Sequence, residues 1–138
     1  MVVTKRIQQR TKGRCDIIDI TQQLISEVAQ SGLKDGIVTV FVVGSTAGLT
    51  TIEYEPGLME DFCTFWQRVA PEGIPYSHDL RWDENNGYSH VRASLLGPSL
   101  TIPFSSGRPI LGTWQQVVLI DFDIRPRSRE IVLQMLGE

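Results

Sequence analysis

The segment IVTVFVV, residues 37–43, decides the fold, because it is a nearly continuous run of β-branched and aromatic side chains. Such side chains favour strands. Turn-forming residues bound the run, with Asp35 and Gly36 before it and Gly44 after it. An apolar run without alternation is typical of a strand that is buried on both faces. We therefore expect this segment to be the central strand of a sheet.

On the N-terminal side of this run, the pattern predicts two strands and a helix. Apolar and polar residues alternate loosely in residues 2–8 and 15–20, and a turn at residues 12–13 favours pairing of these two strands. The helix is predicted to begin at Thr21, whose hydroxyl is a capping group, and to end at Gly32. Its apolar positions recur every three or four residues, at Leu24, Ile25, Val28 and Ala29.

On the C-terminal side, we expect five more strands and two more helices. The strands are predicted at residues 49–54, 100–104, 110–111, 117–122 and 131–136, with a hairpin turn at residues 105–107. One helix starts at Pro56 and stops before Pro71, and its aromatic stripe is expected to be core. A polar loop, residues 76–88, leads to a short helix, residues 90–96.

The order of these elements predicts one α+β domain over residues 1–138, with a few packed helices. Strands and helices do not alternate regularly and no repeat is present, which disfavours a doubly wound sheet. The length is that of a single domain. Hydrophobic residues make up 41% of the chain and charged residues 21%, as in ordinary globular proteins.

The charge pattern disfavours a nucleic-acid partner. The net charge is -3, and Lys and Arg are dispersed except for Arg125, Arg127 and Arg129. Those three arginines either hold one phosphate group or protect a strand edge from mispairing. No apolar run approaches the length of a membrane-spanning helix, so no membrane partner is expected.

The cysteines indicate an intracellular protein. Cys15 and Cys63 are the only two, they lack the Cys-x-x-Cys spacing, and no apolar secretory segment follows Met1. We therefore expect two free thiols and a cytoplasmic location.

His78 and His90 flank the polar loop, and imidazole is both a common metal ligand and a proton carrier. Closure of the loop would bring the two rings together. Their spacing matches no known metal signature, so surface or capping histidines are the alternative. Glu53 lies in a mostly apolar strand that leaves the small-residue loop. Its carboxylate is a candidate base, metal ligand or ammonium partner, or else an exposed strand-end group.

Small and polar residues near the second histidine suggest a site for a polar ligand. The candidates are Thr46 in the small-residue loop after the central strand, then Ser94, Ser99 and Gln115. Arg92 and Arg108 add guanidinium groups that match phosphate or carboxylate. For the glycines among them, turn formation is the simpler interpretation.

The stretch from His90 to Phe104, followed by Gly107-Arg108 and by residues 111–116, closely resembles the signature of the YjbQ-like family, UPF0047. Residues 45–50 with Glu53, the Tyr76-x-His78-Asp79 element and Asn86 four residues before His90 extend the resemblance over nearly the whole chain. The resemblance implies a compact α+β fold with a mixed β-sandwich, a homotrimer and a polar pocket near the subunit contacts.

The same resemblance implies a weak activity like that of secondary thiamine-phosphate synthases, in which a thiazole phosphate is joined to a pyrimidine pyrophosphate. The leading hypothesis is thus an enzyme acting on a small phosphorylated metabolite. His78 and His90 would be proton carriers or ligands of a divalent metal, zinc or magnesium, and Glu53 the base. Family members commonly have a histidine where this chain has Gly44. The rival hypothesis is therefore a metabolite- or metal-binding module without catalysis.

Overall fold

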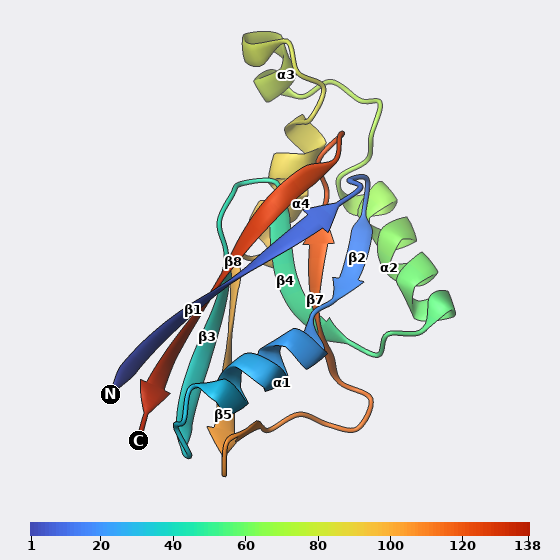
Figure 1. Ribbon diagram of the computed structural model, residues 1–138. Coiled ribbons are helices and arrows are strands. Elements are labelled where there is room, and N and C mark those ends of the chain that lie inside the picture. The colour runs from blue at the N-terminus through green and yellow to red at the C-terminus, as the bar shows by residue number, and fades with distance from the viewer.

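The structure is a computed structural model of residues 1–138 with eight strands and four helices (Figure 1). One group of strands comprises β1 (Val2–Thr11), β3 (Gly36–Val42), β5 (Ser99–Ser105), β6 (Arg108–Pro109) and β8 (Arg127–Gly137). These form a five-stranded sheet in the order β1-β8-β3-β5-β6. The second group comprises β2 (Asp16–Asp19), β4 (Ala47–Ile52) and β7 (Gln116–Asp121), in the order β2-β7-β4.

The helices are α1 (Thr21–Gln30), α2 (Pro56–Val69), α3 (Ser77–Trp82) and α4 (Gly87–Leu96). The predicted α+β class is confirmed.

The main core lies between the two sheets. In β3, Val38, Val40 and Val42 are fully buried and belong to this core, while Ile37 and Phe41 are about two-fifths exposed on the opposite face. The segment is central, between β8 and β5, as predicted. The expectation that both its faces are buried is wrong, because nothing in the chain covers the outer face of the five-stranded sheet.

β7 is instead the strand that is buried on both faces. Val117 and Leu119 point into the core between the sheets, while Val118 and Ile120 belong to a second cluster with Trp66 of α2. The molecule therefore has three layers: the five-stranded sheet, the three-stranded sheet, and α2 with α4 over the latter. Strand β7 can be buried on both faces because it is the middle strand of the middle layer.

The first two strands do not pair with each other, which corrects the predicted strand pair. β1 pairs with β8 and β2 pairs with β7, each antiparallel. The connection between them has three successive residues with positive φ, Gly13 at 84°, Arg14 at 56° and Cys15 at 62°. This left-handed stretch carries the chain from one sheet to the other instead of folding it back on itself.

Two helix starts differ in their capping. Thr21 is the first residue of α1, but its hydroxyl is not the cap; it accepts a hydrogen bond from the Val117 N–H at 2.8 Å. The prediction of a Thr21 cap is therefore wrong. α2 is capped by Glu55, whose carboxylate accepts hydrogen bonds from the N–H groups of Gly57 and Leu58, both at 2.8 Å.

The aromatic stripe of α2 is core only in part, and the prediction is corrected accordingly. Trp66 is buried against Phe122, whereas Phe65 and Val69 are about half exposed. Trp66 is the only fully buried residue of this helix, and Met59, Phe62 and Cys63 are partly buried against the same cluster.

Cys15 and Cys63 form a disulfide, so the expectation of two free thiols is wrong. The bond joins the left-handed turn before β2 to the middle of α2. The two Cα atoms are 6.0 Å apart, within the usual range for a disulfide. The expectation rested on compartment and spacing, and a separation of 48 residues reveals no proximity in space.

The polar loop of residues 76–88 contains a short helix that the prediction missed. This helix, α3, projects from the end of the molecule opposite α1 (Figure 1). Its apolar side chains Leu80 and Trp82 are mostly exposed. None of the helices has the length and hydropathy needed to span a bilayer.

Candidate functional site

The structure brings the two histidines together where α3 meets α4. His78 is the second residue of α3 and His90 lies in the first half of α4. The centres of the imidazole rings are 4.4 Å apart, and the ring planes are tilted by 41°. We call these two side chains the histidine pair.

Asp79 fixes α3 against the start of α4. Its Oδ1 accepts a hydrogen bond from the Gly87 N–H at 2.8 Å. A glycine is required at residue 87, since an added Cβ would lie 2.6 Å from the Cβ of Tyr76. The same Asp79 oxygen lies 3.6 Å from Nδ1 of His78, a buried nitrogen without a hydrogen-bond partner in the chain. His78 thus has an unused polar atom within the site.

The environment of the histidine pair favours a neutral His90. Burial lowers the pKa of His90 below its ordinary value of 6.5, and the neighbouring His78 lowers it further. The negative charges of Asp123, Glu84 and Asp79 oppose this shift but do not outweigh it. A neutral imidazole has one ring nitrogen that can accept a proton, so His90 is suited to act as a base near neutral pH.

Asp123, just beyond β7, is the centre of a polar network that supports the histidine pair. Its carboxylate accepts hydrogen bonds from Thr46 Oγ1 at 2.9 Å and from Asn86 Nδ2 at 3.3 Å. Arg127 Nη2 lies 2.8 Å from it in an ion pair. Burial opposes the charge, but these bonds and the Ile124 N–H hold the pKa of Asp123 below its usual value. Asn86 directly precedes α4, so this network sets the start of the helix that carries His90.

A buried ion pair lies directly beside Asp123. Arg129 binds Asp121 with two hydrogen bonds, from Nε at 2.7 Å and from Nη2 at 2.9 Å. Its Nη2 also donates to Thr46 Oγ1 at 2.6 Å. Thr46 was predicted to contact a ligand, but its hydroxyl is hydrogen-bonded to Arg129 and Asp123. Of the arginine cluster, Arg127 and Arg129 bind carboxylates in the chain, which differs from both interpretations of the sequence.

Glu53 does not lie near the histidine pair within one chain. It follows β4, whereas Thr46 precedes that strand, and six strand residues span about 20 Å at the usual rise. Glu53 lines a surface pocket of about 460 Å³ together with Asp19, Thr113 and Trp114.

Arg108 and Gln115 line a different pocket, of about 720 Å³, between α1 and the segment of residues 106–116. Gln115 is held by two hydrogen bonds: its Oε1 accepts from the Gly112 N–H at 3.0 Å, and its Nε2 donates to Thr51 Oγ1 at 3.2 Å. The segment of residues 106–116 therefore lines a separate pocket and does not enclose the histidine pair.

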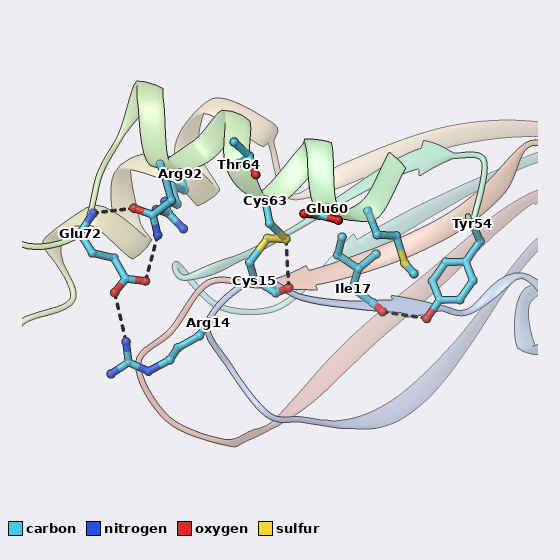
Figure 2. Close-up of a pocket in the computed structure, with 11 residues that line it drawn as sticks. Arg14, Cys15, Ile17, Tyr54, Glu60, Cys63, Thr64, Glu72 and Arg92 are labelled. Atoms are coloured by element: carbon cyan, nitrogen blue, oxygen red, sulfur yellow. Dashed lines mark hydrogen bonds and ion pairs between the residues drawn. A yellow bond between two sulfur atoms is a disulfide. The ribbon is translucent and has the colours of Figure 1, made fainter. Parts of the chain in front are cut away.

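The remaining predicted residues of α4 and β5 point elsewhere. Arg92 is 1% exposed and donates from Nε to the Ala70 carbonyl at 2.9 Å, where α2 ends. Its guanidinium lies over the Tyr88 ring and borders the pocket of Figure 2. The Ser94 hydroxyl returns to the His90 carbonyl at 2.7 Å, and Ser99 is exposed at the start of β5.

As a metal site, the histidine pair offers two imidazoles and no third ligand. Nowhere in the chain do three or more His, Cys, Asp or Glu side chains gather in a ligating group. The carboxylates of Asp79 and Asp123 are already bound by other groups of the chain. Residues of one subunit therefore do not fit a complete zinc site, which takes at least three protein ligands.

Sequence reasoning missed Asp121, Asp123 and Arg129, the buried charges beside the histidine pair. A signal for the two carboxylates was present: the hydrophobic run of residues 117–120 passes directly into Asp-Phe-Asp. Charged residues that close a fully buried strand are partly buried themselves and need partners. Their partner Arg129 could not be identified, because the sequence does not show which side chain of β8 faces them.

Comparison with known proteins gives the same family throughout. A family model described as UPF0047 protein YjbQ-like matches residues 5–138. A UPF0047 protein of Archaeoglobus fulgidus is 39% identical over 127 residues, which cover 92% of this chain and 96% of that protein. The UPF0047 protein YugU of Bacillus subtilis is 33% identical over 135 residues, covering 96% of this chain and 98% of the relative.

Solved structures agree with these matches. A YbjQ-like protein of unknown function from Sulfolobus solfataricus P2 superposes with a TM-score of 0.94 at 34% identity, covering 100% of this chain and 99% of that one. A hypothetical protein from Aeropyrum pernix K1 superposes with a TM-score of 0.91 at 32% identity, with 99% of both chains covered.

Proposed function

Because this chain belongs to the UPF0047 YjbQ-like family, we propose that it is an enzyme of small phosphorylated metabolites, with a weak thiamine-phosphate synthase-like activity. The observation that carries the proposal is the histidine pair. Two imidazoles whose centres are 4.4 Å apart, one of them with a lowered pKa, form an arrangement suited to proton transfer. We also propose a cytoplasmic location, where such metabolites are made and used.

In the proposed reaction, the thiazole nitrogen attacks the methylene carbon of the pyrimidine while the carbon–oxygen bond to pyrophosphate breaks. The histidine pair donates hydrogen bonds to the departing pyrophosphate oxygens, since an imidazole ring has at least one N–H donor. The thiazole nitrogen has no proton to lose, so the proton that His90 passes to the departing pyrophosphate comes from solvent. The unused Nδ1 of His78 supports this role, because a bound ligand would supply its partner.

We propose that the protein works as a homotrimer in which neighbouring subunits share each site. The uncovered face of the five-stranded sheet supports self-association, since Ile37, Phe41 and Leu136 are 40 to 48% exposed there. In a cyclic trimer, two different surfaces meet at each interface. The histidine pair of one subunit would then face Glu53, Arg108 and Gln115 of the next. This arrangement would join groups that are separated within one chain.

A zinc or magnesium ion bound to His78 and His90 belongs to the same proposal. The chain supplies two ligands, so the remaining ones would come from water, from phosphate oxygens or from Glu53 of a neighbouring subunit. Removal of metal by a chelator would then lower the binding of inorganic pyrophosphate.

A subunit-mixing experiment tests the shared site. His90→Asn and Glu53→Gln are each expected to lose the joining of thiazole phosphate to pyrimidine pyrophosphate. After the two variants are dissociated and mixed equally, about one quarter of wild-type activity is expected, because a quarter of the interfaces regain both groups. Ser94→Ala is the matched control on α4, since its hydroxyl reaches only the backbone. An inactive mixture would contradict the shared site. A fully active His90→Asn would contradict the proposed role of the histidine pair in the reaction.

A binding module without catalysis is the second candidate, favoured by the lack of a third ligand beside the histidine pair. It predicts saturable binding of inorganic pyrophosphate, seen as a shift of the His90 ring signals in NMR, without any product from the two substrates. Product formation that depends on His90 would rule this candidate out.

A further inference from the structure

A groove of about 530 Å³ runs along the seam between β2 and α2, and the Cys15–Cys63 disulfide lies in its middle (Figure 2). One end of the groove is lined by Ile17, Tyr54 and Met59. The other end is charged, with Arg14, Glu72 and Arg92. Both cysteines line the groove and are partly exposed residues, so the disulfide lies beside space that a small reagent can enter.

The disulfide holds a turn that has its own conformational cost. Arg14 and Cys15 both have a left-handed backbone, which is unfavourable for a residue with a side chain. The Arg14 N–H donates to the Asp123 carbonyl at 2.8 Å, so the turn is fastened to the residue whose carboxylate anchors α4. The disulfide thus connects α2, through this turn, to the surroundings of the histidine pair.

The structure also provides for the reduced form. The Sγ of Cys63 lies 3.4 Å from the carbonyl oxygen of Cys15, so this oxygen is a nearby hydrogen-bond acceptor for a thiol at residue 63 once the two sulfurs have separated. α2 has other attachments to the body of the protein. Trp66 packs edge-to-face on Phe122, with ring centres 5.2 Å apart, and Arg92 binds the Ala70 carbonyl at the end of the helix. Loss of the disulfide would therefore loosen α2 without unfolding the chain.

We propose that Cys15 and Cys63 form a site of reversible thiol–disulfide exchange, whose reaction partner is a dithiol that enters by the groove. A thiolate of the dithiol attacks one sulfur, forms a mixed disulfide and releases the other cysteine as a thiolate. The second thiol of the reagent then attacks the mixed disulfide. Two electrons and two protons pass to Cys15 and Cys63, and the dithiol leaves as its own disulfide. The inference is independent of the proposed enzyme activity.

The test follows both redox states of the full chain under native conditions. Dithiothreitol should make both cysteines available to iodoacetamide, adding two carbamidomethyl groups by mass, and oxidised dithiothreitol should restore a form that takes none. Both forms should unfold cooperatively. Hydrogen exchange in α2 and in residues 14–17 should be about tenfold faster in the reduced form. A disulfide that is reduced only in denaturant, or a reduced chain that does not unfold cooperatively, would overturn the proposal.

Two variants at residue 63 test the effect of losing the disulfide without any reagent. Cys63→Ser keeps a donor for the Cys15 carbonyl, while Cys63→Ala has none, and neither forms the disulfide. Both should show the fast α2 exchange of the reduced protein, regardless of the reagent added. If Cys63→Ser exchanges as slowly as the oxidised wild type, the disulfide does not control α2 and the inference is wrong.

Discussion

The guanidinium of Arg129 lies against Gly44, so that a Cβ added to residue 44 would stand 2.7 Å from Nη1 of Arg129. The backbone of Gly44 also has a φ of 134°, which side chains rarely tolerate. Arg129 cannot move aside freely, because it is bound to Asp121 and Thr46. The guanidinium therefore fills the space that a side chain at residue 44 would need.

Gly44→Ala should lower the free energy of unfolding by about 2–3 kcal/mol, from backbone strain and from displacement of Arg129. Gly44→His should cost at least as much, so it would not simply add a third imidazole. Urea denaturation measures the effect. Gly73→Ala is the control, because Gly73 also has a positive φ but open space around it. Equal losses in the two alanine variants would show that contact with Arg129 adds nothing.

The lowered pKa of His90 predicts how stability depends on pH. The unfolded chain takes up the proton more readily than the folded one, so stability is full above pH 6.5 and falls as pH decreases through the lower pKa of the folded state. Urea midpoints should therefore decrease between about pH 7 and about pH 5. His90→Gln should have a weaker dependence over this window. An unchanged slope in that variant would show that His90 is not the responsible group.

The turn of the hairpin between β5 and β6 can be changed so that the free energy of unfolding rises. Ser106 and Gly107 both have positive φ, 51° and 75°, as a type I′ turn requires, and asparagine is favoured over serine at the first of these positions. Ser106→Asn should raise the free energy of unfolding by about 0.5 kcal/mol, measured by urea denaturation. Gly107→Ala, where space for a methyl group exists, should lower it by about 1 kcal/mol. A loss of stability in Ser106→Asn would contradict this account of the turn.

The proposed trimer depends on the uncovered face of the five-stranded sheet. Phe41→Lys introduces a charge on that face and should reduce the mass in solution from that of a trimer to that of a monomer, by light scattering after size exclusion. Val69→Lys is the control, since it places the same charge on a similarly exposed apolar residue of α2, away from the five-stranded sheet. A wild-type chain that elutes as a monomer would refute the proposed trimer.

The fold was predictable where pattern and burial agree, as in α4 and β5. The strand expected at residues 110–111 is misplaced, because β6 is Arg108–Pro109, directly after the turn. It was not predictable where the partner lies far along the chain. The apolar residues Ile17 and Ile18 indicated a strand, but they did not show that β2 pairs with β7 and not with β1. Apolar composition alone could not show that one face of β3 is uncovered while β7 is buried on both.

The candidate site was predictable to the same extent. The proximity of His78 and His90 followed from a loop short enough to close. The position of Glu53 could not be predicted. The alternation of residues fixes the face of a strand on which a side chain lies, but it does not show which end of the strand is near the histidine pair. Asp123 was overlooked since its role depends on Thr46, Asn86 and Arg127, which come from three separate parts of the chain.

The projecting helix α3 gives the protein an optical probe of its own. Trp82 lies on that helix, four residues after His78, with most of its indole in water, whereas Trp66 is enclosed. Any molecule that seats on the imidazoles and draws α3 inward would shift the emission of Trp82 to the blue, while Trp66 would report only loss of the fold. With Trp114 replaced by phenylalanine, occupancy could be followed by fluorescence without a label.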